Sequence, residues 1–172
     1  VFFRVFVQNA LDIHQKTTSM TLKKFRRYAW YRLARSLPTN NGRKFALSRI
    51  QIAEIGGDCY YGPNVTITPF GRNGIRLILI TLEDRSTVSA DIKLLCSMYL
   101  ENFPLASVCE TTKPITVERD AWISASATLH RGIKIEHDLV VNAGAVVTDG
   151  VPPQTVVGSV PTETTGEIEV LN

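Results

Sequence analysis

The sequence predicts an all-β fold, a left-handed parallel β-helix built from six-residue repeats, with an amphipathic helix at its N-terminal side. Two observations predict this fold. Apolar side chains recur at every sixth position over much of the chain after residue 54. Before residue 50 the apolar side chains instead recur at helical spacing among many basic residues.

The six-residue series forms three stretches. Its members are Ile55, Tyr61 and Ile67, then Leu82, Val88 and Leu94, and then Val117, Ile123, Leu129, Ile135, Val141 and Val147. Small or aliphatic residues stand two positions before later members, at Cys59, Val65, Ser86, Ile92, Ala121, Ala127, Ile133, Leu139 and Ala145. An α-helix has about 3.6 residues per turn and cannot produce this period. Three flat faces of six residues give a coil of roughly eighteen, and stacked coils bury the inward positions in ladders.

The N-terminal helix is predicted over Met20 to Leu37. Its apolar residues are spaced by three and four, at Leu22, Phe25, Ala29, Leu33 and Leu37. Pro38 ends the helix, and Pro38 to Gly42 (PTNNG) is predicted to be a turn-rich linker. We therefore expect a basic helical extension over residues 1–49 and a β-helix domain over residues 50–172, with an excursion loop at 95–114.

Composition narrows the class of protein. No run of about 18 apolar residues exists, so no membrane-spanning helix is expected. The three cysteines include no CxxC pair, so neither a disulfide scaffold nor a zinc site is expected, and a reducing cytoplasm fits. The net charge of +3 is unevenly divided, because residues 1–49 hold eleven of the nineteen Lys and Arg and one of the sixteen acids.

Three segments carry a resemblance to a known family. The run ITVERDAWISASATLHRGIKIEHDLVVNAGAVVTDGVPPQTVVGSVP (Ile115 to Pro161) resembles the carboxy-terminal half of hexapeptide-repeat acetyltransferases. These are maltose and galactoside acetyltransferase-like enzymes and relatives of the polysaccharide-biosynthesis type. YYGPNVTI (Tyr60 to Ile67) resembles an earlier coil, and LLCSMYLENFPLA (Leu94 to Ala106) resembles the start of the family's excursion loop.

The resemblance implies an activity and a site. It implies a homotrimer that binds acetyl-CoA as co-substrate in a groove between coils and transfers the acetyl group to a sugar or glycan acceptor. The implied groove positions are Trp122, Ala125, Ala143, Thr148 and Asp149. Tyr99 stands where the family has its catalytic histidine, and the alternative is a packed aromatic side chain. Asp149 stands where the family has a lysine, and an acid there repels cofactor phosphates.

The histidines offer one substitute base and no metal site. His130 follows the inward Leu129, so it should face outward and is the candidate replacement for the missing histidine. His14 and His137 are interpreted as surface residues. No two histidines have metal-ligand spacing, which also argues against a carbonic-anhydrase-like zinc site.

The basic helix has several open interpretations. Residues 20–37 could lie on an anionic membrane surface, pack against the acidic coils of the protein's own trimer, or be a solvated face. No nucleic-acid-binding motif is present. The function expected is acetyl-CoA-dependent O- or N-acetylation of a sugar or polysaccharide precursor. The alternative is a catalytically inactive trimeric scaffold or binding protein.

Overall fold

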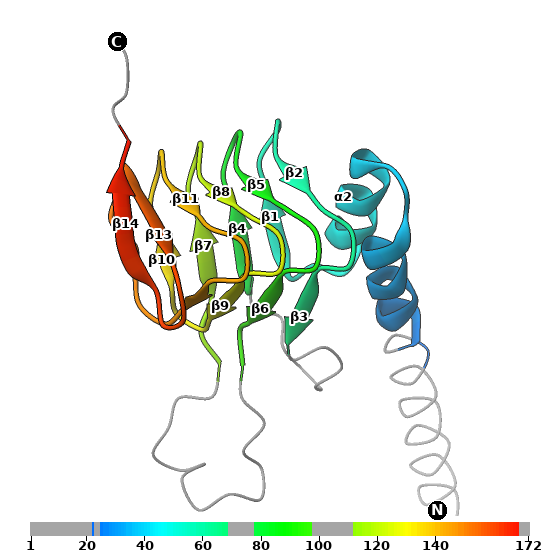
Figure 1. Cartoon of the computed structure of the whole chain (residues 1–172). Coiled ribbons are helices and arrows are strands. Elements are labelled where there is room, and N and C mark those ends of the chain that lie inside the picture. Colours follow the sequence, from blue (N-terminus) through cyan, green and yellow to red (C-terminus); the bar gives the residue numbers. More distant parts are fainter. Residues whose placement is uncertain (1–21, 23–24, 69–77, 98–111, 169–172) are drawn as a thin grey trace, which may run out of the picture.

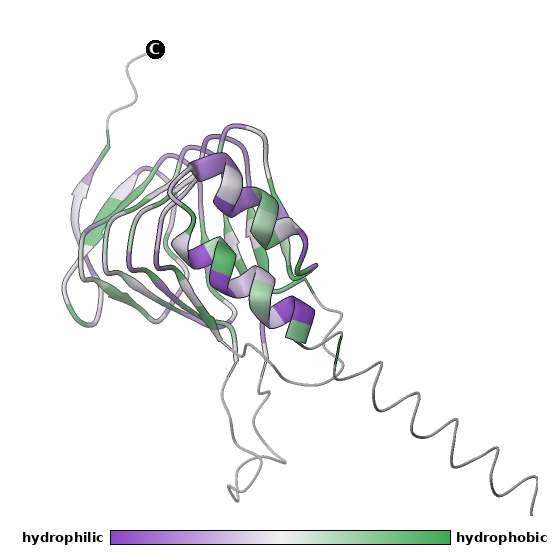
Figure 2. Ribbon diagram, turned by 90° about the vertical axis from the view of Figure 1, so that its right-hand side faces the viewer, coloured by the Kyte–Doolittle hydropathy of each residue, from purple (hydrophilic) through white to green (hydrophobic). Residues whose placement is uncertain are grey.

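The computed structural model describes residues 22, 25–68, 78–97 and 112–168, and it shows a triangular prism of stacked β-coils (Figure 1). Two helices stand side by side over the end of the prism formed by the first coil (Figure 2). The C-terminal strands close the other end. Tyr99 and most of the predicted excursion loop lie outside the described residues.

Within the described residues, four coils of three strands each form the prism. The first two coils contain β1 (Ala53–Ile55), β2 (Tyr60–Tyr61), β3 (Thr66–Thr68), β4 (Ile80–Leu82), β5 (Thr87–Val88) and β6 (Lys93–Leu95). The next two contain β7 (Ile115–Val117), β8 (Trp122–Ile123), β9 (Thr128–His130), β10 (Lys134–Ile135), β11 (Val140–Val141) and β12 (Val146–Val147).

Equivalent strands of successive coils pair in parallel and form the three faces. The first face has the order β1-β4-β7-β10, and the third has the order β12-β9-β6-β3. The second face runs β14-β13-β11-β8-β5-β2, where β13 (Thr155–Gly158) and β14 (Glu163–Glu167) pair antiparallel and end the solenoid. We call these the first, second and third faces.

The predicted ladders form the interior of the prism. On the third face Ile67 pairs with Leu94 and Leu94 with Leu129, so members of the six-residue series lie directly over one another. Every member of the series is buried except Ile55, which is half-buried beside the helices. Every predicted companion position is buried as well, including the polar Ser86. The prediction of inward-facing ladders is confirmed.

The first helix, residues 25–36, lies against the first coil through one side. Tyr31 and Ala34 are buried, and the Tyr31 hydroxyl accepts a hydrogen bond from the backbone N–H of Ile67 at 3.1 Å. Most of the predicted apolar stripe lies on the other side of the helix, where Phe25 is 71% exposed and Leu33 is 40% exposed. Leu37, its last member, follows the helix and packs against the core. The helix is amphipathic as predicted, but the side that carries Phe25 and Leu33 faces away from the prism.

The predicted linker at Pro38 to Gly42 is wrong in part, because a second helix, α2 (Asn40–Ser48), begins inside it. Thr39 caps α2 by accepting a hydrogen bond from the backbone N–H of Gly42 at 3.2 Å. The Asn40 side chain forms two hydrogen bonds to the first coil. It donates to the Cys59 carbonyl at 3.1 Å and accepts from the Tyr61 N–H at 2.9 Å. These bonds satisfy the open edge of the first coil, as a terminal cap of a solenoid must.

Arg43 completes this cap from within α2. It is 3% exposed, and its guanidinium donates to the carbonyls of Tyr61, Leu37 and Pro38 at 2.7, 2.8 and 2.9 Å. The arginine thus joins the first coil to the turn between the helices. Among the described residues, no helix combines the length and apolarity needed to cross a bilayer.

Candidate active site

The first group of predicted residues lies where the strands of the third face end. His130 ends β9, its Cα pairs with that of Leu95, and its side chain is half-buried on the outside of the prism. Val147 pairs with Leu129, so Thr148 takes the next position beside His130. The Thr148 hydroxyl donates to the Asp149 carboxylate at 3.1 Å. The structure therefore brings His130, Thr148 and Asp149 to one edge.

The two ends of the excursion meet at this same edge. Ser97 and Thr112 form an antiparallel bridge, and the Thr112 hydroxyl donates to the Ser97 hydroxyl at 3.1 Å. The Lys113 N–H donates to the Cys96 carbonyl at 2.9 Å. Leu95 pairs with His130, and the excursion leaves the prism two residues after Leu95, at Ser97. His130 is thus the described histidine that lies nearest the base of this loop.

The second group lies on the second face and at the corner between the second and third faces. The Trp122 ring is 54% exposed, and its Nε1 donates to the Ser89 hydroxyl at 3.2 Å. Ala125 and Ala143 are exposed at the corner, where the Gly144 N–H donates to the Ala125 carbonyl at 3.0 Å. Small side chains at this corner leave the backbone accessible to a ligand.

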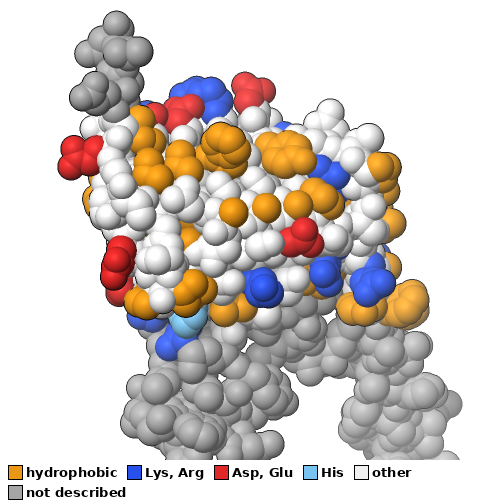
Figure 3. Space-filling model, viewed as in Figure 1, with side chains coloured by type: hydrophobic (Ala, Val, Ile, Leu, Met, Phe, Trp, Pro, Cys, Tyr) orange, Lys and Arg blue, Asp and Glu red, His pale blue; other side chains and the backbone are white. Residues whose placement is uncertain are grey.

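Trp122 belongs to an outward row that crosses the second face. Successive coils place Tyr60, Thr87, Trp122, Val140 and Val156 in register there. Figure 3 shows apolar side chains gathered over this face. Tyr60 and Trp122 are exposed, whereas Val140, Val156 and the intervening polar Thr87 are half-buried. Exposed aromatic side chains on one face make it a candidate interaction surface.

Among the described residues of one chain, the two groups lie apart. Ala125 lies three residues before β9 begins and His130 ends it, so the strand separates the corner group from the group with Thr148 and Asp149. Trp122 lies on a different face from His130. A single site would need the two groups to come from neighbouring subunits.

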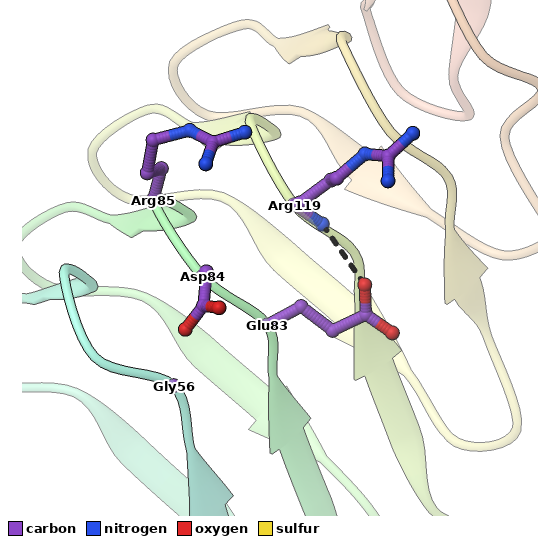
Figure 4. Close-up of a pocket in the computed structure, with 5 residues that line it drawn as sticks. All are labelled: Gly56, Glu83, Asp84, Arg85 and Arg119. Carbon is purple, nitrogen blue, oxygen red and sulfur yellow. Dashed lines mark hydrogen bonds between the residues drawn. The ribbon is translucent and has the colours of Figure 1, made fainter.

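A pocket that the sequence analysis did not identify lies at the corner between the first and second faces. It is lined by Gly56, Glu83, Asp84, Arg85 and Arg119 (Figure 4). The Arg119 N–H donates to the Glu83 carboxylate at 3.3 Å, and the Gly57 N–H donates to the Asp84 carboxylate at 2.6 Å. The lining acids thus accept bonds from the backbone of neighbouring coils and hold the corner together.

The same corner carries two charge networks. Arg85 donates twice to Asp120, at 2.6 and 2.5 Å, and these bonds raise the pKa of the guanidinium and lower the pKa of the carboxyl. Lys134 Nζ lies 2.8 Å from a Glu118 oxygen, and this bond lowers the pKa of Glu118. Coil stacking juxtaposes Arg85 with Asp120 across an offset of 35 positions that includes the excursion, and Lys134 with Glu118 across an offset of 16.

Among the described residues, one group has ligand atoms close enough to hold a metal ion, and it was not predicted. Ligand atoms of Glu118, Glu136 and His137 lie within 4.8 Å of one another. Lys134 already contacts both carboxylates, and His137 Nδ1 lies 2.8 Å from the Asp138 carboxylate. Lys134 therefore offsets part of the negative charge of this group, and the His137 Nδ1 atom already has a partner.

The buried thiols offer no nucleophile. Cys59 and Cys96 are free and buried inside the prism. Burial raises the pKa of the Cys96 thiol to about 12, so this thiol stays protonated near neutral pH. The two described cysteines are therefore not candidates for a surface nucleophile.

Known proteins resemble this chain both in sequence and in fold. No protein-family profile matches the chain. Galactoside O-acetyltransferase of Escherichia coli K12 is 24% identical over 155 residues, which cover 80% of this chain and 75% of that protein. Solved structures of acetyltransferases also resemble this one, at sequence identities under 25%, and this likeness shows the fold alone.

Two of these structures illustrate the likeness. A hexapeptide-repeat acetyltransferase of Vibrio cholerae, solved with acetyl-CoA, superimposes with a TM-score of 0.62 and 17% identity, covering 88% of this chain and 90% of that one. A maltose O-acetyltransferase of Clostridium difficile gives a TM-score of 0.61 and 19% identity, covering 87% and 89%. The predicted left-handed parallel β-helix with its N-terminal helix is confirmed. The chain is thus similar in sequence to a galactoside O-acetyltransferase and shares the fold of hexapeptide-repeat and maltose acetyltransferases.

Proposed function

We propose that the protein is an acetyl-CoA-dependent acetyltransferase acting on an oxygen or nitrogen of a sugar or polysaccharide precursor. The observation that carries this proposal is the similarity to galactoside O-acetyltransferase over 80% of the chain. The neighbour solved with acetyl-CoA supports the co-substrate, and the maltose enzyme supports the class of acceptor. Cys59 and Cys96 are free thiols, which fits a cytoplasmic enzyme.

The proposed assembly is a homotrimer with a site between neighbouring subunits. Its support is the separation of the two residue groups on one chain, with Trp122 on the second face and His130 at the end of the third. Packing one prism beside another would cover the apolar row around Trp122. It would also let Ala125 and Ala143 of one subunit face His130 of the next, with acetyl-CoA between them.

The proposed chemistry is general-base catalysis. A sugar hydroxyl is a weak nucleophile, and an imidazole within hydrogen-bond reach takes its proton as the oxygen attacks the thioester carbonyl. His130 is the proposed base. Backbone N–H groups that line the groove stabilise the oxyanion before the carbon–sulfur bond breaks and the thiolate leaves. Thr148, beside His130, is a polar contact for the cofactor or acceptor.

The second candidate function is an inactive trimeric scaffold. Two residues favour it: Tyr99 at the family's histidine position, and Asp149 with an exposed carboxylate where the family has a lysine. Tyrosine titrates near pH 10, so it is a poor base at neutral pH. A scaffold of this kind would keep the trimer while losing cofactor binding.

Thermal unfolding with acetyl-CoA, followed by a thiol-release assay over galactosides and maltose, tests the proposal. A ligand present at a hundredfold excess over its Kd stabilises the folded state by about 2.7 kcal/mol, which raises the Tm by several degrees. We expect such a rise and thiol release with at least one sugar. No rise at millimolar acetyl-CoA, together with no thiol release, would contradict the enzyme and support the scaffold.

Matched histidine variants test the base. His130→Asn should lower kcat by about a hundredfold or more, the usual contribution of general-base catalysis, while the Tm rise with acetyl-CoA persists. His137→Asn is the control, because His137 lies at the other corner and pairs with Asp138. Equal rates for His130→Asn and wild type would exclude His130 as the base.

A further inference from the structure

The outer side of the first helix is an apolar surface without a partner in the described structure. Leu22, Phe25, Ala29 and Leu33 are spaced by three and four, so they share one side of the helix. Leu22 is 64% exposed, Phe25 71% and Leu33 40%, and Ala29 is also exposed. We call these four residues the outer stripe.

The helix cannot turn to bury the outer stripe against the prism. Its other side is held by Tyr31 and Ala34, which are buried against the first coil. The Ile67 N–H donates to the Tyr31 hydroxyl at 3.1 Å, and the Asn64 N–H donates to the Arg35 carbonyl at 2.9 Å. The orientation of the helix is therefore fixed by hydrogen bonds to the coil, and the outer stripe faces away from it.

The apolar surface continues onto α2. The Phe45 ring is 51% exposed and meets the half-buried Trp30 ring edge-on, with 5.9 Å between centroids. The guanidinium of Arg49 lies over the Phe45 ring, 4.7 Å from its centroid. Both helices stand over the same end of the prism, where Figure 2 shows apolar and hydrophilic segments alternating along them.

Cationic side chains flank this surface, and the described residues of the two helices include no acid. Arg26 and Arg32 are exposed on the two sides of the outer stripe, and Arg49 is exposed beside Phe45. No Asp or Glu occurs in the sequence between Asp12 and Glu54. An apolar stripe bordered by arginines is the surface that binds at the headgroup level of an anionic bilayer.

We propose that this helical end of the protein docks on an anionic membrane surface. The outer stripe and Phe45 enter the boundary between headgroups and acyl chains, while Arg26, Arg32 and Arg49 contact lipid phosphates. Two copies paired through the stripe would bring like charges together, which disfavours a second copy as the occupant. A nucleic acid would contact the arginines but gain nothing from exposed Leu and Phe side chains.

Co-sedimentation of the full chain with lipid vesicles tests the proposal. We expect binding to vesicles of phosphatidylcholine mixed with phosphatidylglycerol, weaker binding to phosphatidylcholine alone, and a decline as salt screens the charges. Phe25→Ser with Leu33→Ser should weaken binding to the mixed vesicles about tenfold or more. Arg26→Glu with Arg32→Glu should reduce the preference for the anionic lipid.

Matched controls separate this surface from general stickiness. Val160→Ser removes an equally exposed apolar side chain at the opposite end of the prism, and Lys93→Glu reverses an exposed charge on the third face. Both should bind vesicles like wild type. Circular dichroism should show that Phe25→Ser with Leu33→Ser melts like wild type, and the acetyl-CoA response should be unchanged, which keeps this test independent of the proposed catalysis.

Four results would overturn the proposal. The wild type could fail to sediment with anionic vesicles, or the stripe variant could sediment equally well. Analytical ultracentrifugation could show wild-type association beyond the trimer that the stripe variant abolishes, which would make a second copy the occupant. Binding to an oligonucleotide that the arginine variant abolishes, without vesicle binding, would assign the surface to nucleic acid.

Discussion

In the solenoid the periodic apolar side chains point inward, whereas those of the first helix point outward. Leu94 and Leu129 stack inside the prism with no exposed surface, while Phe25 and Leu33 lie on the outer stripe. Both sets are equally clear as periodicities in the sequence. A period identifies an element and its apolar side, but it does not say what that side contacts.

The difference arises from how each element satisfies its backbone. A coil of the solenoid must stack on its neighbours, because its strands bond only to other coils, and stacking buries the inward positions. A helix satisfies its own backbone hydrogen bonds internally, so either side is free to contact the prism. The contact here is decided by Tyr31, whose hydroxyl accepts a bond from the first coil, and by the small Ala34.

The largest effect is expected inside the prism. Leu129→Ala leaves a cavity in a ladder that cannot collapse, because strands above and below hold the coil, and should lower the free energy of unfolding by about 2–5 kcal/mol. Thr128→Ala, on the outer side of the same strand, should cost less than about 1 kcal/mol. Urea unfolding of both variants measures the difference, and equal losses would mean that the ladder is not the core.

The next largest effect is expected where the helices join the prism. Arg43→Met keeps the aliphatic stem but leaves three carbonyls without their donor, so we expect a loss of about 2–3 kcal/mol. Arg49→Met, which removes an exposed guanidinium, should change stability by less than about 0.5 kcal/mol. Thermal and urea unfolding should separate the two variants, and similar stabilities would mean that the cap does not depend on Arg43.

The sequence predicted the ladders because each inward position obeys one local rule that repeats. It did not predict α2, because Asn40 and Gly42 are typical of turns. The helix starts there since Thr39 caps it and the Asn40 side chain bonds to two backbone groups of the first coil, a contact between residues about 20 apart. Contacts of that kind have no periodic signal.

The candidate site also has a part that the sequence predicted and a part that it did not. The sequence identified His130 and Thr148 separately. Coil stacking places them side by side, because the preceding residues, Leu129 and Val147, pair with each other. The charged corner was overlooked because each of its residues is unremarkable until the coils are stacked. Arg85 and Asp120 become partners only through the offset of one coil plus the excursion.

A smaller effect is expected on the buried side of the first helix. Ala34 is fully buried, so Ala34→Leu overpacks the contact with the first coil and should cost about 1–3 kcal/mol, although leucine is a good helix former. The thermal unfolding midpoint should fall accordingly. An unchanged midpoint would mean that the helix can lift from the prism without cost.

The smallest effect is expected one residue away, on the outer stripe. Leu33→Ala removes a large apolar side chain that contacts no core, and alanine has the higher helix propensity, so stability without lipid should change by less than about 0.5 kcal/mol. With anionic vesicles present, the same variant should lose affinity. Adjacent positions would then respond in opposite ways: adding apolar bulk at 34 destabilises the fold, and removing it at 33 affects binding alone. A large loss of stability in Leu33→Ala without vesicles would show that the stripe is covered by the protein itself.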